Sequence, residues 1–301
     1  MCTPNIDKFA EEATLFKKHF CNSAPCSPSR ASLYTSTYQM TNRVLTNGTP
    51  LDARFTNYAR EARSAGLDPV LFGFTDIGED PRTLPANDKR LSTYEGVLPG
   101  LREVCGMRFM EKESAWIDHL RRKGHAVPST DMDGLSFGIS LHGKSAEGTA
   151  YEDGGAHPLP LWLPEADHCT QFLVDQTMDY IQTHADEFVV HLSLIRPHPP
   201  FVAPEPYNTM YPPSVLEDKL PFARAASREE EAGRHALMPY LLSVFGGAAM
   251  NESAVRGKQA SYFGLITEVD LHLGRLFAML KDQGLWDSTL IVLTSDHGEM
   301  M

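Results

Sequence analysis

Four stretches of the chain repeat apolar residues at helical spacing, and three shorter stretches are dominated by apolar residues. The helical spacing covers residues 7–18, 54–65, 169–184 and 255–283, and glycines at 66 and 284 stop the second and fourth stretches. The short apolar stretches cover 69–74, 187–194 and 289–294, and we expect them to be buried strands. Helices that alternate with buried strands predict an α/β architecture built in layers.

Two longer segments lack this regular pattern. From about residue 76 to 164 the periodicity weakens, and Gly, Pro, Asp and Ser are frequent. We expect this segment to be a loop-rich excursion that covers one end of the sheet. Residues 203–257 contain Pro-rich and charge-rich stretches, and we expect them to form a lid or a contact within a homo-oligomer.

Composition narrows the class of protein. With 301 residues, 42% of them hydrophobic, the chain can bury the core of one large domain. A net charge of −12 argues against nucleic acid as a partner, although local cations still allow a small anionic substrate. Five cysteines without zinc-like pairs predict no disulfide framework, and the cytoplasm is the simplest location. No run is apolar enough to span a membrane, and no secretory signal begins at Met1.

Cys26 lies where a helix is expected to begin. Pro28 suits the first helical position, so we expect the helix to open just after Cys26, with its free N–H groups directed back toward that side chain. Such a helix start favours sulfate, phosphate or phosphonate groups, and Arg30 adds a permanent cation that can fork onto an anionic oxygen. The plainer alternatives are that Cys26 is a small buried hydrophobe or forms a disulfide with Cys21.

Polar residues follow the predicted strands at the end where ligands bind in α/β sheets. Asp296 and His297 come directly after the strand at 289–294, His198 follows the strand at 187–194, and Asp76 follows the strand at 69–74. Because ligands of open α/β sheets bind at the carboxyl ends of strands, we expect these segments to converge on one crevice.

Each of these residues also has an ordinary structural explanation. Asp296 and His297 suit a divalent ion such as Ca²⁺, Mn²⁺, Mg²⁺ or Zn²⁺, and we favour this role over an ordinary strand-exit turn. His198 could meet a substrate oxygen or leaving group, or be a turn histidine between prolines. Asn47 lies in what is otherwise an Asn-Gly turn, and His191 lies within an apolar strand, where we expect a core histidine.

Several motifs together resemble one enzyme family. Cys26 to Arg30, with Leu33 and Thr35 behind it, resembles the signature of the type I sulfatases of the alkaline phosphatase superfamily. Residues 3–7 and 294–299 resemble the segment before that signature and the family's metal-binding block. Residues 195–201, Asn47 and residues 264–270 are most similar to the phosphonate monoester hydrolase and arylsulfatase branch. The matching blocks run from about Thr3 to Glu299, nearly the whole chain.

The resemblance implies a fold and a chemistry. It implies a three-layer α/β/α sandwich around a large central sheet, mixed but mostly parallel, and one catalytic domain over residues 1–301. It implies hydrolysis of sulfate esters or of phosphonate and phosphate mono- and diesters. Cys26 would be oxidised to formylglycine by a formylglycine-generating enzyme, and a divalent metal would bind to Asp296, His297 and the modified Cys26. Arg30 and His198 would be catalytic, and Asn47 would donate a hydrogen bond to the transferred group.

The chain departs from the family in two ways. After the strand that here ends near Gly73, sulfatases carry a Lys-x-His pair and phosphonate hydrolases carry Tyr and Thr. This chain instead has Phe74 and Asp76 at these two positions of the substrate pocket. An aspartate near an anionic substrate would repel it unless the carboxyl group is protonated or turned toward the metal.

The second departure concerns the two ends. We expect this partial domain to lack the family's first strand, with its Asp ligands, and its C-terminal subdomain, with a catalytic lysine. The segment 289–294 would then present an exposed edge that favours association. The alternative functions are a catalytically inactive fragment and a metal-dependent phosphatase or mutase with a Ser or Thr nucleophile.

Overall fold

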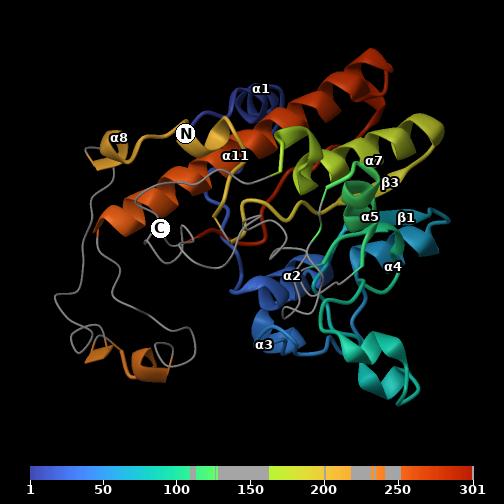
Figure 1. Cartoon of the computed structure of the whole chain (residues 1–301). Helices are drawn as coiled ribbons and strands as arrows, with labels where there is room; N and C mark the ends of the chain where they lie inside the picture. The colour runs from blue at the N-terminus through green and yellow to red at the C-terminus, as the bar shows by residue number, and fades with distance from the viewer. Residues whose placement is uncertain are drawn as a thin grey trace.

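The protein folds as a small parallel sheet with helices on both faces (Figure 1). A computed structural model describes residues 1–108, 113–125, 127, 163–199, 201–217, 232–233, 235–240 and 252–299. Its helices and strands are α1 (Pro4–Glu12), α2 (Cys26–Thr35), α3 (Gln39–Asn42), α4 (Tyr58–Ser64), β1 (Pro69–Gly73), β2 (Arg102–Gly106), α5 (Ala115–Arg122), α7 (Cys169–Thr183), β3 (Val189–Leu192), α8 (Pro213–Glu217) and α11 (Glu252–Asp282). Short 3-10 turns join them: η1 (Pro81–Thr83), η2 (Lys89–Ser92), η3 (Glu165–Asp167), η4 (Tyr207–Thr209) and η5 (Trp286–Ser288).

The described sheet has the order β2-β1-β3, and both pairings are parallel. Val70 and Phe72 of β1 pack into a core with side chains of α5 and α7, whereas His191 of β3 lies on the other face against Tyr34 of α2 and Tyr58 of α4. The alternation of side chains along a strand therefore separates two helical layers with one sheet between them. The α/β fold class and its three layers are confirmed. His191 is also a core histidine, as expected, because its Nδ1 lies 2.6 Å from the Tyr58 hydroxyl.

The helix predictions hold best for the two longest helices that the structure describes. α7 and α11 lie within a few residues of the predicted 169–184 and 255–283, and Gly284, with a φ of 68°, follows α11. α4 begins at Tyr58 rather than at residue 54, because the Asn57 side chain accepts hydrogen bonds from the backbone of residues 59 and 60. α1 begins and ends earlier than predicted, because the Asp270 carboxylate accepts hydrogen bonds from its first N–H groups.

A strand and a helix lie in the described part of the segment 76–164, which the sequence predicted to be rich in loops. The strand β2 escaped prediction because its first three side chains are exposed, which leaves no apolar run to recognise. The helix α5 begins at the cap residue Ser114 and buries Trp116, Ile117 and Leu120. Residues 109–112, 126 and 128–162 of this segment lie outside the described residues.

The segment 203–257, predicted to be a lid or an oligomer contact, is described only in part. α8 and η4 pack against α11, and they belong to the part of the segment that the structure covers. Residues 218–231, 234 and 241–251 lie outside the described residues, so the lid and the oligomer contact stay predictions. Among the helices that are described, none has the length and apolar composition needed to cross a membrane.

The prediction of a core strand at 289–294 is wrong. Leu290 and Val292 are 91% and 76% exposed, and the segment pairs with no strand in the described part of the chain. Ile291 alone packs inward, against Met279 and Leu280 of α11. Exposed and inward-facing side chains therefore alternate, as they do along a strand. No strand in the described part of the chain pairs with this backbone, so the segment is not part of a sheet.

Gly73 joins the carboxyl ends of β1 and β3. Its φ is 101°, and a Cβ built there would lie 2.1 Å from the Ser193 carbonyl oxygen. Only glycine allows this close approach, which places the residues after β1 directly beside those after β3.

We expect Gly73→Ala to destabilise the protein by about 3 kcal/mol or more, because the methyl group adds a steric overlap to the cost of a left-handed backbone. Gly66→Ala is the matched control: its φ is 89°, but no atom lies within 4 Å of the built Cβ. It should cost only about 1–2 kcal/mol. Urea denaturation followed by circular dichroism measures both losses. Equal losses would mean that the contact with Ser193 does not constrain the strand ends.

Candidate active site

The helix α2 begins at Cys26 itself, two residues earlier than the sequence predicted. Pro28 is its third residue, a position that proline tolerates because the N–H groups of a first turn have no acceptor within the helix. The N–H of Ser27 donates to Asn47 Oδ1 over 3.0 Å, so Asn47 lies against the start of the helix. Cys26 is buried and Cys21 is exposed, and both are free thiols, which excludes the disulfide alternative in this structure.

Asp296 and His297 lie beside the start of this helix. His297 Nε2 is 3.5 Å from Cys26 Sγ, across 271 residues of sequence. The Ser29 hydroxyl donates to the Asp296 carbonyl oxygen, and Arg30 Nε donates to Asp296 Oδ2 over 2.8 Å. Two contacts from α2 therefore hold the metal-binding block that the sequence predicted.

The chemistry of these donors fits a divalent cation. One ligand atom each from Cys26, Asp296 and His297 lies within 4.8 Å of the other two. His297 Nδ1 donates to the Gly298 carbonyl over 2.7 Å, which leaves Nε2 as the nitrogen available to a metal ion. The sulfur of Cys26 stands in for the oxygens that a formylglycine would present.

Arg30 lies beneath the site and is directed at protein groups. It is 8% exposed, and its Nη1 donates to the Phe74 carbonyl and the Ser193 hydroxyl, each over 3.1 Å. Its guanidinium carbon lies 4.4 Å from the centroid of the Phe74 ring. The sequence favoured Arg30 as a donor of two hydrogen bonds to a substrate oxygen. In the structure, Nε already donates to Asp296, and Nη1 joins α2 to the residues after β1 and β3.

The charges around Cys26 favour a thiolate. Burial raises the pKa of the Cys26 thiol, but hydrogen bonds from His198 and His297 outweigh burial and lower the pKa to about 6. The hydrogen bond to Cys26 in turn raises the pKa of His297 to about 9, with help from the Gly298 carbonyl and the Asp296 charge. Burial also raises the pKa of Asp296, yet the charges of Arg30 and His297 hold it below its usual value. These pKa shifts favour two charge pairs, a Cys26 thiolate with a protonated His297 and an Asp296 carboxylate with Arg30.

His198 reaches the site from the turn after β3. Its Nδ1 donates to the Pro199 carbonyl over 2.6 Å, because a carbonyl oxygen can only accept, and this leaves Nε2 for the site. The guanidinium of Arg196, which is buried, donates to the His198 carbonyl over 3.1 Å. The side chain contributes a hydrogen bond to Cys26, so the turn is the source of a functional group beside the thiol.

Asp76 faces the start of α2. Ser27 Oγ donates to Asp76 Oδ2 over 2.8 Å, and the carboxyl group is buried. Burial raises the pKa of Asp76 to about 7, with the charges of Cys26 and Glu95 acting in the same direction. The sequence allowed this carboxylate to turn toward the metal, but the structure directs it to Ser27, outside the group formed by Cys26, Asp296 and His297.

The structure thus gathers all the residues that the sequence selected, from five separate segments. They are Cys26, Arg30, Asn47, Phe74, Asp76, His198, Asp296 and His297. The roles assigned to them stay predictions. Sequence reasoning missed the supporting hydroxyls of Ser27, Ser29 and Ser193, and the Tyr34 hydroxyl that accepts from Arg30. Only Tyr34 carried a signal, because it lies one helical turn after Arg30.

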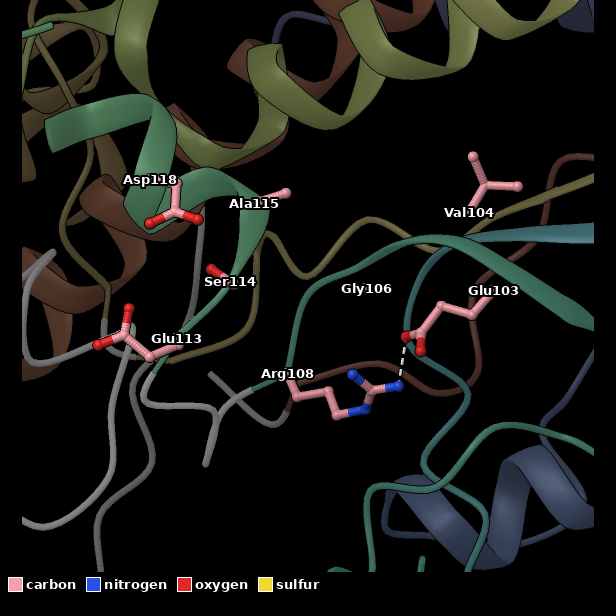
Figure 2. A pocket seen from close by; sticks show the side chains of 8 residues that line it. All are labelled: Glu103, Val104, Gly106, Arg108, Glu113, Ser114, Ala115 and Asp118. Atoms are coloured by element: carbon pink, nitrogen blue, oxygen red, sulfur yellow. Dashed lines mark hydrogen bonds and ion pairs between the residues drawn. The ribbon is translucent and has the colours of Figure 1, made fainter. Parts of the chain in front are cut away.

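A separate hollow of about 420 Å³ lies between the end of β2 and the start of α5 (Figure 2). Its lining includes Glu103, whose carboxylate pairs with Arg108, and the acidic residues Glu113 and Asp118. None of the candidate site residues lines it. The chemistry of Cys26 therefore does not belong to this hollow.

Comparison with known proteins shows which family the chain matches. The family model described as Sulfatase matches residues 1–301. The chain is 36% identical over 312 residues to the multifunctional alkaline phosphatase superfamily protein PehA of Trinickia caryophylli, covering 99% of this chain and 58% of that protein. It is 25% identical to an arylsulfatase of Clostridium perfringens, again over 99% of this chain and 58% of the relative.

Solved structures show the same likeness. The phosphonate monoester hydrolase of Agrobacterium radiobacter matches with a TM-score of 0.86 and 40% identity, over 99% of this chain and 58% of that one. The enzyme SpPMH of Silicibacter pomeroyi matches with a TM-score of 0.85 and 37% identity over the same shares. The chain spans 58% of the length of each of these relatives. With a family model matched along its whole length, the chain belongs to the sulfatase family of the alkaline phosphatase superfamily.

Proposed function

We propose that this chain carries the nucleophile and part of the metal site of a hydrolase that acts on sulfate esters or on phosphonate and phosphate mono- and diesters. The observation that carries the proposal is the contact between Cys26 at the start of α2 and His297, with Asp296 held in the same group by Arg30. Relatives named as arylsulfatase and phosphonate monoester hydrolase support both ester classes.

Cys26 is the proposed nucleophile after oxidation to formylglycine. When hydrated, that group would supply a geminal diol, of which one hydroxyl would attack sulfur or phosphorus and displace the ester's alcohol. Loss of the proton from the other hydroxyl would then break the carbon–oxygen bond to the transferred group, release it as an anion and restore the aldehyde. The chain contributes the surroundings: burial excludes bulk water, and His198 and His297 place hydrogen bonds on the side chain at position 26. These groups would stabilise an oxyanion at that position for the same reason that they stabilise a thiolate.

A divalent cation would be held by Asp296, His297 and the modified side chain of Cys26, and when bound it would lower the pKa of the nucleophile and neutralise a substrate oxygen. Arg30 orients the Asp296 carboxylate, and the Gly298 carbonyl orients the His297 ring. His198 can hold a proton at Nε2 for a substrate oxygen or for the leaving group, since Nδ1 is fixed on Pro199.

Asn47 is proposed to contact the transferred group. Its Oδ1 accepts from the N–H of Ser27, so its amide nitrogen is the end that remains to donate to an anionic oxygen. This arrangement also fixes the amide against the helix whose first residue is Cys26. The contact supports a donor role for Asn47 in place of a simple Asn-Gly turn.

The unconverted protein should show a reactive Cys26 thiolate above about pH 6. With a chelator present, the alkylation rate of Cys26 by iodoacetamide should be low below pH 6, rise through it and then level, because only the thiolate reacts. His297→Gln should move the midpoint of the curve of alkylation rate against pH upward by about 1 pH unit or more, since it removes a hydrogen bond that favours the thiolate. His191→Gln is the control, because His191 bonds to Tyr58. Peptide mass spectrometry measures the rates; a wild-type midpoint near about pH 8.5, typical of a free thiol, would contradict the site electrostatics.

Coexpression with a formylglycine-generating enzyme should convert Cys26 to an aldehyde. The converted protein should hydrolyse an aryl phosphonate monoester or an aryl sulfate, and Cys26→Ala should lower kcat by about 10³-fold or more. The exposed Cys21 offers a control, since Cys21→Ala should leave turnover unchanged. Mass analysis of the Cys26 peptide separates the two ways to fail: an unmodified thiol would remove the proposed nucleophile, whereas a converted protein without turnover would identify an inactive fragment.

The converted protein should bind one divalent ion and lose activity when a chelator removes it. Calorimetric titrations with Ca²⁺, Mn²⁺, Mg²⁺ and Zn²⁺, each alone, should find a saturable site, and Asp296→Asn should weaken it by at least about tenfold. Asp287→Asn, in the exposed turn η5, removes the same charge outside the site. An equal loss in both variants would mean that Asp296 acts only through the net charge of the protein.

A further inference from the structure

Asp76 holds a buried carboxyl group against the start of α2 and is not used in the proposed reaction. The residue is 3% exposed, and Oδ2 accepts from Ser27, the residue that follows Cys26. Among the described residues, the donor to this carboxylate is a neutral hydroxyl, and no lysine, arginine or histidine forms an ion pair with it. The carboxyl group is therefore held against α2 by a neutral donor and not by a cation.

The backbone holds Asp76 firmly in this place. The hydroxyl of Thr75 donates to the Gly96 carbonyl over 2.9 Å and accepts from the N–H of Leu98 over 2.7 Å. On the other side, the N–H of Ile77 bonds to the same Gly96 carbonyl over 3.4 Å. Asp76 itself has a φ of 54°, a conformation that aspartate and asparagine adopt more readily than most residues. The hydrogen bonds of Thr75 and Ile77 fix the backbone on both sides of Asp76, and Ser27 holds its carboxyl group against α2.

The charges around Asp76 leave its negative charge without a dedicated cation. Cys26, Arg30 and Glu95 are the charged groups that act on it. Arg30 already pairs with Asp296 through Nε, and Cys26 and Glu95 repel a carboxylate. A second anion that approached Cys26 would therefore meet an additional negative charge in a buried setting, where charges interact over longer distances than in water.

We propose that Asp76 is a specificity-determining residue, which makes the Cys26 site favour esters with one negative charge over phosphate monoesters with two. This inference rests on the proposed function, because it concerns which ester reaches the nucleophile. Sulfate monoesters, phosphonate monoesters and phosphodiesters each carry one charge on the transferred group, whereas a phosphate monoester carries two at neutral pH. Each additional charge on the substrate adds a repulsion with Asp76 that Arg30 does not cancel.

The charge beside Cys26 can be measured without turnover. Iodoacetate and iodoacetamide alkylate the same thiolate and differ in the negative charge of the reagent, so the ratio of their rates at Cys26 reports the local charge. In the unconverted protein with a chelator at pH 8.5, Asp76→Asn should raise the ratio of the iodoacetate rate to the iodoacetamide rate by about fivefold or more. Asparagine keeps the size and the backbone preference of aspartate, and Asp76→Gly is the second variant if the first does not fold.

Two comparisons isolate the position of the charge. Asp88→Asn makes the same change in net charge at an acid paired with Arg90, and should leave the ratio at Cys26 unchanged. The exposed Cys21 in every variant reports any change that is not local. An unchanged ratio in Asp76→Asn would overturn the proposal, because it would show that the group is already neutral or too distant to act on an incoming anion.

Turnover by the converted protein tests the substrate preference itself. The ratio of kcat/KM for an aryl phosphate monoester to kcat/KM for an aryl phosphonate monoester should rise by about fivefold or more in Asp76→Asn, and stay at the wild-type value in Asp88→Asn. Loss of both activities in every protein, wild type included, would reject the proposed function while the alkylation ratio still decides the charge. A changed alkylation ratio with an unchanged substrate ratio would overturn the assignment of specificity to Asp76.

Discussion

The buried guanidinium of Arg30 is the contact on which the rest of the site depends. One side chain joins four segments: α2, which carries it; the Phe74 carbonyl after β1; the Ser193 hydroxyl after β3; and the Asp296 carboxylate. Hydrogen bonds to charged groups contribute about 1.5–3 kcal/mol each, and removing one partner of a buried pair costs about 3–5 kcal/mol. The positions of Cys26 and Asp296 relative to the sheet are therefore fixed by a cation that need not touch substrate.

This arrangement explains how several charges can share a small buried volume. Arg30 neutralises Asp296, and a protonated His297 neutralises a Cys26 thiolate, so each anion has a cation within hydrogen-bonding reach. Asp76 is the exception, because its hydrogen-bond donor is the neutral Ser27 hydroxyl and burial raises its pKa to about 7. Because no cation among the described residues neutralises Asp76 inside the site, its charge is the one that acts most strongly on an anionic substrate. The difference between Asp296 and Asp76 is thus one of partners, not of residue type.

The sequence predicted those parts of the structure that depend on local chemistry. Gly66 and Gly284 marked helix ends, the apolar run before Gly73 marked β1, and the motif around Cys26 selected the residues that the fold brings together. The sequence did not predict features that depend on a contact with a residue far away along the chain. The start of α1 depends on Asp270, and the exposed strand β2 is recognisable only through its pairing with β1. The same reason hid Ser193, an ordinary serine in sequence that becomes an acceptor for Arg30 only when β3 lies beside β1.

The segment 289–294 shows the limit of side-chain patterns most clearly. Its run of four apolar residues is typical of a buried strand, and Ile291 does pack inward, yet a strand also needs a neighbour for its N–H and C=O groups. No described segment provides one. The residues that follow it are nevertheless held in the site, because Ser29 and Arg30 bind Asp296 directly. In this chain, therefore, the metal-binding block owes its position to α2 and not to the sheet, and the ordering of Asp296 should follow the integrity of α2 more closely than that of the segment before it.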